Sequence, residues 1–202
     1  MSIQDIKDKK INIIDIIDSQ KQTKLWRKGC IWYKNGKSNE CEIYQKSLLK
    51  QIIGYIPNKT NDRFNMETND IINKKIVMKD KNGFEFTEDF DGKVINNNTI
   101  YFNLKFCCDA GGAQTRTLRE VYHFINCQIK YIIDKYVDNN TDNKIDTYFI
   151  NILDGDTSYK NMNKFNYLLE KDRGNINNII KKYIFIGNML EFSKNKTIIE
   201  LC

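Results

Sequence analysis

The chain has 202 residues and a formal net charge of +6, and 41% of its residues are hydrophobic. That is enough apolar material for the core of one ordinary domain, and it excludes an intrinsically disordered chain. No apolar run approaches the ~18 residues of a membrane-spanning helix. The charged start MSIQDIKDKK contains no signal-peptide core, so we expect a cytoplasmic protein.

Lysine, asparagine and isoleucine together supply 84 residues, whereas alanine occurs twice and arginine five times, a bias typical of an AT-rich genome. The positive charge fits a nucleic acid or another anionic partner. The six cysteines form no CxxC pair and match no zinc pattern, so we expect reduced, mostly buried thiols. The single histidine, His123, excludes any site built on two histidines.

The first part of the chain predicts two helices and a hairpin. Isoleucines near helical spacing predict a helix over residues 3–17. The Asn35-Gly36 pair predicts the turn of a hairpin over residues 26–42. A second helix is expected over residues 47–56, ending before Pro57.

Three strands are then expected to form a meander. They cover residues 74–78, 84–90 and 99–106, with turns at Asn82-Gly83 and at residues 96–98. In the third strand, Ile, Phe and Leu alternate with Tyr, Asn and Lys, which is the pattern of a strand with two different faces.

The second half predicts two further helices and two further strands. Residues 118–136 repeat apolar side chains at i, i+3 and i+4 over five turns, which predicts a long helix. The apolar run 147–153 predicts a strand buried on both faces. A short helix over residues 163–169 and a strand over 183–186 follow. The expected fold class is α/β, a mixed sheet of about five strands flanked by helices.

The most informative stretch runs from Glu88 to Glu120. It holds the acidic end of one strand, a lysine on the next strand, and then the Gly111-Gly112 pair before the long helix. Both alanines and two of the five arginines lie between Asp109 and Glu120. This concentration suggests that the segment has kept these residues despite the compositional bias of the chain.

These residues resemble the PD-(D/E)xK nuclease superfamily, and within it the type II restriction endonucleases. In that family an acidic residue ends or follows the second strand, and an acid-x-lysine triplet lies on the third. Phe90-Asp91-Gly92 matches the first element and Asn103-Leu104-Lys105 the second, with eleven residues between Asp91 and Asn103. Asn103 stands where the family has an acid.

The resemblance implies a restriction-endonuclease-like fold and Mg²⁺-dependent, sequence-specific hydrolysis of phosphodiester bonds in double-stranded DNA. Asp91 would bind the metal, Asn103 would assist it, and Lys105 would position the attacking water or stabilise the phosphate. Elementary chemistry agrees with these roles, because Mg²⁺ takes carboxylate and carbonyl oxygens. Asn103 and Lys105 share a strand face because side chains repeat every two residues.

The resemblance also implies partners and a division of the chain. One site cuts one strand and a palindrome presents two equivalent positions, so we expect a homodimer. A cognate DNA methyltransferase would belong to the same system, in a bacterial cell or a virus-infected host cell. The single nuclease domain would span residues 1–202, with its core at about 70–190 and residues 1–60 available for DNA binding or dimerisation.

A further acid is needed if Asn103 is a weak ligand, and three candidates are open. Some restriction enzymes recover the missing acid from the following helix, which makes Glu120 a candidate. Helix geometry turns Glu120 away from the sheet, however, so Asp89 and Asp109 stay beside it as alternatives.

The start of the long helix is the expected DNA contact. Gly112 lets the backbone approach a phosphate closely, and a helix N-terminus favours anions. Arg116 and Arg119 can contact phosphate or guanine, and Gln114 can read adenine.

Two other functions stay open. A DNA-binding relative that has lost cleavage would also carry Asn103. The substitution Asn103→Asp would distinguish it from an active nuclease, because only a catalytically active site would gain activity. Asp154-Gly155-Asp156 after the buried strand resembles the aspartate-nucleophile motif of haloacid dehalogenase-type phosphatases. Only 48 residues follow Asp154, too few for the rest of that fold.

Overall fold

The structure, a computed structural model, describes residues 22–34, 38–73, 86–138 and 145–202. It is a mixed α/β fold with a four-stranded and a three-stranded sheet. The helix expected over residues 3–17, the strand expected over 74–78, and the turns expected at Asn35-Gly36 and Asn82-Gly83 lie outside the described residues.

The larger sheet has the strand order β4-β5-β6-β7. Strand β4 (Gly92–Ile95) is antiparallel to β5 (Thr99–Phe106), whereas β5, β6 (Thr147–Asp154) and β7 (Ile184–Gly187) run parallel. Every residue of β6 is buried, which explains its apolar sequence. The carboxyl ends of β5 and β6 therefore lie side by side.

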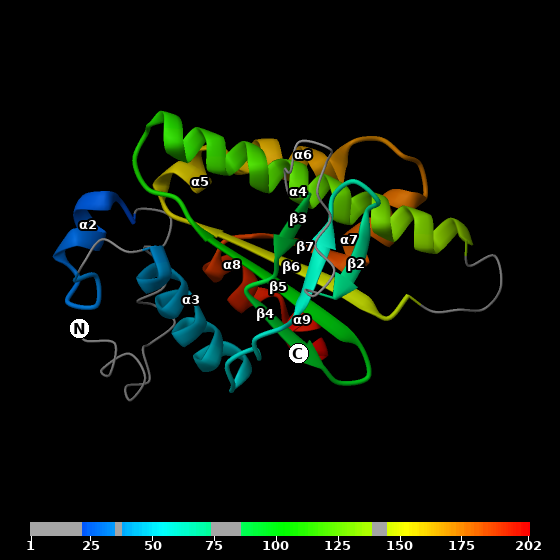
Figure 1. Cartoon of the computed structure of the whole chain (residues 1–202), viewed down its shortest axis with the longest axis horizontal. Coiled ribbons are helices and arrows are strands. Elements are labelled where there is room, and N and C mark those ends of the chain that lie inside the picture. Colours follow the sequence, from blue (N-terminus) through cyan, green and yellow to red (C-terminus); the bar gives the residue numbers. More distant parts are fainter. Residues whose placement is uncertain (1–21, 35–37, 74–85, 139–144) are drawn as a thin grey trace.

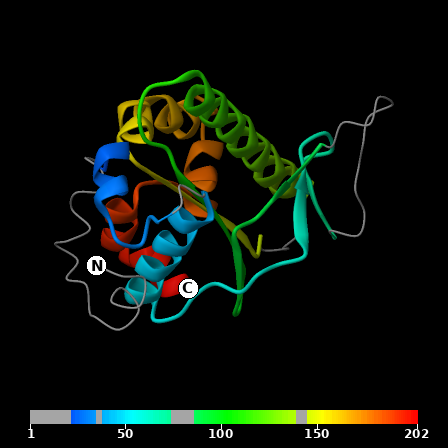
Figure 2. The ribbon, with the colours of Figure 1, turned by 60° about the vertical axis from the view of Figure 1, so that its left-hand side comes forward.

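Helices cover both faces of this sheet (Figures 1 and 2). The long helix α4 (Gly112–Asp138) lies on one face, and α3 (Ser38–Ile53) and α8 (Met189–Lys194) lie on the other. Their apolar stripes face the strands, as in the contact of the Phe102 and Phe192 rings at 6.4 Å. None of the described helices is long and apolar enough to cross a membrane.

Short helices fill the connections. Glycine and asparagine precede several of them, and Asn188 forms a capping box with Glu191 at the start of α8. These helices are α2 (Lys24–Gly29), α5 (Asp156–Lys160), α6 (Met162–Glu170), α7 (Ile176–Tyr183) and α9 (Lys196–Leu201).

The smaller sheet has the order β2-β1-β3, from β1 (Asp62–Asn65), β2 (Asp70–Asn73) and β3 (Thr87–Asp89). Its Phe64 side chain is fully buried, and its ring contacts the rings of Phe124 on α4 and other core aromatics. The smaller sheet is thus joined to the core of the larger one.

Several sequence predictions are confirmed. The strand over 99–106 is β5, the apolar run 147–153 is β6, and the strand over 183–186 is β7 within one residue at each end. The helices predicted over 118–136 and 163–169 lie within α4 and α6. All six cysteines are free and four of them are buried.

The predicted hairpin over residues 26–42 is wrong, because this segment contributes to α2 and α3. Thr23 caps α2 through its hydroxyl, which accepts a hydrogen bond from the Trp26 N–H at 3.2 Å. The Trp32 ring stacks on Tyr44 of α3 with 4.7 Å between centroids. The predicted helix over 47–56 is only the second half of α3.

The single five-strand sheet and its meander are also wrong. β3, within the predicted strand 84–90, pairs with β1 in the smaller sheet. The antiparallel neighbour of β5 is β4, a short strand that we did not predict. Tertiary pairing decides these short strands, because four residues carry little periodic signal.

Candidate functional site

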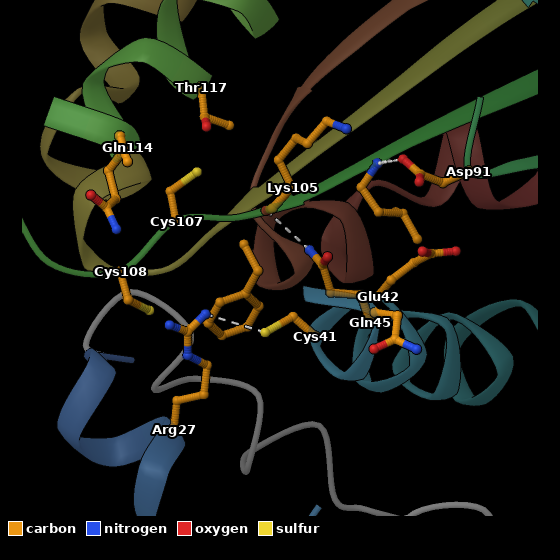
Figure 3. A pocket seen from close by; sticks show the side chains of 14 residues that line it. Arg27, Cys41, Glu42, Gln45, Asp91, Lys105, Cys107, Cys108, Gln114 and Thr117 are labelled. Carbon is orange, nitrogen blue, oxygen red and sulfur yellow. Dashed lines mark hydrogen bonds between the residues drawn. The ribbon is translucent and has the colours of Figure 1, made fainter. Parts of the chain in front are cut away.

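A pocket of about 400 Å³ opens where the ends of β4 and β5 meet α2, α3 and the start of α4. Figure 3 shows Asp91 and Glu42 toward one end, Arg27 at the opposite end, and Lys105 between them. Gln114 also lines the pocket. Two carboxylates and two cationic side chains, from α2, α3, β5 and the residue before β4, thus surround one open space.

Asp91 is held in place by the backbone of its neighbouring strand. Its Oδ2 atom accepts a hydrogen bond from the Leu104 N–H at 2.7 Å, and its own N–H donates to the Phe102 carbonyl at 2.8 Å. Burial raises the pKa of Asp91, and nearby Lys105 opposes that rise. Asp91 and Lys105, both predicted site residues, therefore lie close enough to interact.

Lys105 also faces a second, smaller cavity of about 70 Å³ together with Glu88 and Glu120. Burial raises the pKa of Glu88, Lys105 lowers it, and Glu120 raises it further. Glu120 is exposed, as its helix angle predicts, yet it lies beside Lys105. Lys105 therefore lines both cavities, one with Asp91 and Glu42 and the other with Glu88 and Glu120.

Asn103 lies inside the core and does not line this pocket. Its side-chain amide donates to Asn151 Oδ1 at 3.0 Å, and the Asn151 amide donates to Gln128 Oε1 at 2.9 Å. The three side chains form a buried chain of amides that joins β5, β6 and α4. Within the described part of the chain, Asn103 Oδ1 is buried without a hydrogen-bond partner. The amide is engaged in packing the sheet against α4.

Glu42 is a pocket residue that we did not single out from the sequence. It lies on α3, forms an ion pair with Lys46 one turn later, and raises the pKa of Asp91 by its charge. A helical interpretation of residues 38–53 would have placed Glu42, Gln45 and Lys46 close together at successive turns. The Asn35-Gly36 turn signal obscured that pattern.

Asp154 is fully buried behind the pocket. Its Oδ1 atom accepts a hydrogen bond from the Met189 N–H at 3.0 Å, and its Oδ2 atom accepts one from Gln45 Nε2 at 2.6 Å. Burial raises its pKa to about 6. Gln45 Nε2 also donates to the Lys105 carbonyl at 3.3 Å. The Asp154 side chain therefore links β6 to α3 and α8, and Gln45 extends the link to β5. This geometry does not favour a nucleophile.

The predicted DNA-contacting residues lie on α4 but do not all face the same pocket. Gly112 is the first residue of α4, and Gln114 lines the pocket beside it. Arg116 is exposed outside the pocket. Arg119 lines a different groove of about 620 Å³ with Tyr122 and other residues of α4 and α6.

The other two candidate acids are engaged in ion pairs. Asp89 accepts two hydrogen bonds from the Arg63 guanidinium, at 2.7 and 3.2 Å. Asp109 has a positive φ of 70° and lies 3.7 Å from the Lys24 ammonium. Neither side chain lines the pocket that holds Asp91.

The donor set of the pocket suits a hard cation. In the described structure Asp91 has one oxygen with no hydrogen bond to the backbone, and Glu42 is a second carboxylate of the pocket. In the part of the chain that the structure describes, no three histidine, cysteine or acidic side chains are gathered closely enough to hold a metal by themselves. Mg²⁺ commonly uses one or two carboxylates and completes its shell with water and substrate phosphate.

Known family models, curated proteins and solved structures give no match to this chain.

Proposed function

We propose that the chain is a Mg²⁺-dependent, sequence-specific endonuclease of double-stranded DNA, with a restriction-endonuclease-like fold. The observation that carries this proposal is the fixed position of Asp91 beside Lys105 in an open pocket. The antiparallel pair β4 and β5, followed by the long helix α4 and the parallel strand β6, further supports the proposal.

Asp91 and Glu42 are the side chains that would hold the metal. A bound divalent cation would supply charge stabilisation at phosphate and a lower pKa for the attacking water. The chain's own part is to fix the carboxylates in place. The hydrogen bond from Leu104 orients Asp91, and the packing of α3 against β5 brings Glu42 to the same pocket.

Lys105 would hold the scissile phosphate and orient the attacking water. Its ammonium can donate three hydrogen bonds, and the Asp91 and Glu88 carboxylates lie near enough to feel its charge. Gln114 and the N-terminus of α4 lie on the same pocket, where N–H groups favour an anion. Substrate binding is thus assigned to cations and N–H donors, and metal binding to carboxylates.

A DNA-binding protein without cleavage is the second candidate. The observation that favours it is the buried amide chain of Asn103, Asn151 and Gln128, which leaves β5 without its own acidic ligand. Both candidates predict DNA binding, and only the first predicts strand breaks that depend on Lys105.

The deciding experiment uses the purified full chain, long unmethylated DNA and Mg²⁺, followed by sequencing of the ends. Lys105→Met is the test variant, and Lys181→Gln, an exposed charge change on α7, is its matched control. Ends that share one short motif, present with wild type and control and absent with Lys105→Met, support the nuclease. Bound but intact DNA with all three proteins supports the DNA-binding candidate. Intact, unbound DNA overturns both.

A further inference from the structure

Arg27 occupies the end of the pocket farthest from Asp91 (Figure 3). Its Nη1 atom donates to Cys41 Sγ at 3.3 Å, and its guanidinium lies over the Tyr33 ring, 4.7 Å from the centroid. Its Nε atom is buried and has no hydrogen-bond partner among the described residues. No carboxylate among the described residues lies within ion-pair distance of Arg27.

The other half-buried arginines are satisfied by oxygen. Arg63 forms a two-bond pair with Asp89, and Arg173 donates to two backbone carbonyls at 2.9 and 3.1 Å. Of the three half-buried arginines in the described structure, Arg27 is the one whose hydrogen-bond acceptor is a sulfur atom. Its charge is therefore poorly compensated.

The sulfur neighbours do not supply the missing negative charge. Burial raises the pKa of Cys41 and raises that of Cys108 to about 12, so both thiols are neutral near pH 7. Holding a guanidinium in a half-buried position without an anion costs free energy, and stacking on an aromatic ring offsets only part of it. An anion in the pocket would complete the hydrogen bonds of Arg27.

The helix that carries Arg27 is firmly attached to the strand ends. The Asp156 N–H and the Cys108 thiol both donate to the Gln22 carbonyl at 3.0 Å. Lys24 forms an ion pair with Asp109, which follows β5. Arg27 therefore has a defined position relative to Lys105, as a residue that positions a substrate requires.

We propose that Arg27 binds the non-bridging oxygens of the DNA backbone phosphate next to the phosphate that is cut. This inference rests on the proposed nuclease function and adds a residue to it. The carboxylates Glu42 and Asp91 lie at one end of the pocket and Arg27 at the other, so a strand that crosses the pocket presents successive phosphates to the two ends. The planar guanidinium can donate two parallel hydrogen bonds to phosphate oxygens.

The test compares wild type with Arg27→Gln, Arg27→Lys and the control Lys181→Gln. Binding of a duplex that contains the cleaved sequence is measured over a salt series with Ca²⁺ in place of Mg²⁺, and cleavage is then measured with Mg²⁺. Arg27→Gln should lower the slope of log Kd against log salt by about one and raise KM about tenfold or more. Arg27→Lys should restore the salt slope, because lysine keeps the charge. It should bring KM only part of the way back to the wild-type value, because lysine loses the two-pronged geometry.

A neutral methylphosphonate in place of one phosphate gives a check that folding defects cannot imitate. Moved step by step around the cut, it should weaken wild-type binding at the phosphate that Arg27 contacts and have no further effect at that phosphate in Arg27→Gln. Equal salt slopes and KM values for Arg27→Gln and wild type would overturn the role of Arg27 while leaving the nuclease intact. A wild-type chain that neither binds nor cuts DNA would overturn the nuclease proposal and this inference with it.

Discussion

The Asp91 carboxylate accepts a hydrogen bond from the Leu104 N–H at 2.7 Å, and this contact fixes the acidic end of the pocket beside Lys105. An amide at position 91 can accept the same hydrogen bond through its oxygen, but it carries no charge for a cation. Asp91→Asn should therefore fold normally and lose cleavage by about a hundredfold or more, with DNA binding changed much less. Single-turnover cleavage and binding assays on the same preparation measure the two effects. Cleavage within a few-fold of wild type would contradict the metal role.

Asn103→Asp should destabilise the chain instead of improving the site. The Asn103 amide donates to Asn151 Oδ1, so a carboxylate there would face an acceptor in a buried place. We expect a loss of about 2–4 kcal/mol in the free energy of unfolding at pH 7 and no gain in cleavage. Urea unfolding measures the loss, with Asn178→Asp, an exposed change on α7, as the control. A stable and more active Asn103→Asp protein would restore Asn103 as a pocket residue.

Asp154 makes the stability depend on pH. Its pKa is about 6 when folded, because burial disfavours the charged form, against about 3.9 when unfolded. Between these values the folded state binds more protons, so the contribution of Asp154 is complete below about pH 4 and is lost as the pH rises to 6. The loss amounts to about 3 kcal/mol at most.

Asp154→Asn should remove this dependence. An asparagine oxygen can still accept the Met189 N–H, and rotation of the Gln45 amide would let its oxygen accept from the new side chain. Urea unfolding of both proteins from pH 4 to 7 should show wild type falling relative to the variant. Parallel curves would show that Asp154 titrates at its ordinary pKa.

The elements that follow from local periodicity could be predicted from sequence, and those that depend on distant partners could not. The apolar repeat of α4 and the continuous apolar run of β6 each report burial directly. Strands β3 and β4 carry no such repeat, because they are only three and four residues long. Their place is decided by partners across the sheets.

The same distinction, between features predictable from sequence and features set by distant partners, applies to the candidate site. Asp91 and Lys105 were predicted from the resemblance of their short motifs to a nuclease family, and both line one pocket of the structure. Glu42 and Arg27 come from helices that the turn signal at Asn35-Gly36 led us to interpret as a hairpin. Asn103 shares a strand face with Lys105, yet α4 covers it, and sequence periodicity does not tell which end of a strand face is covered.

Gly155 joins β6 to α5 in a conformation that a side chain would disturb. Its φ is +93°, and an added Cβ atom would lie 2.2 Å from the Cys107 carbonyl oxygen. Gly155→Ala should reduce the free energy of unfolding by at least about 2 kcal/mol. Gly112→Ala, at the start of α4 with open space around the new methyl group, should be neutral or slightly stabilising. Thermal unfolding compares the two, and equal melting temperatures would contradict the expected clash.

The second acid of the pocket can be identified by comparing Glu42→Gln with Glu120→Gln. Glu42 shares the pocket of Asp91 and raises the pKa of that residue, whereas Glu120 meets Lys105 across the smaller cavity that Glu88 also lines. A residue that binds metal should matter more than one that only neighbours the lysine. We expect Glu42→Gln to lower single-turnover cleavage at least tenfold and to raise the Mg²⁺ concentration needed for half-maximal rate.

Glu120→Gln should lower cleavage less, with the Mg²⁺ requirement close to that of wild type. Titration of Mg²⁺ at saturating DNA gives both quantities in one experiment, and Glu170→Gln, an exposed change at the end of α6, serves as the matched control. A larger loss and a larger shift in Glu120→Gln than in Glu42→Gln would reverse the assignment. The metal would then belong on the α4 side of Lys105, where Glu88 and Glu120 lie.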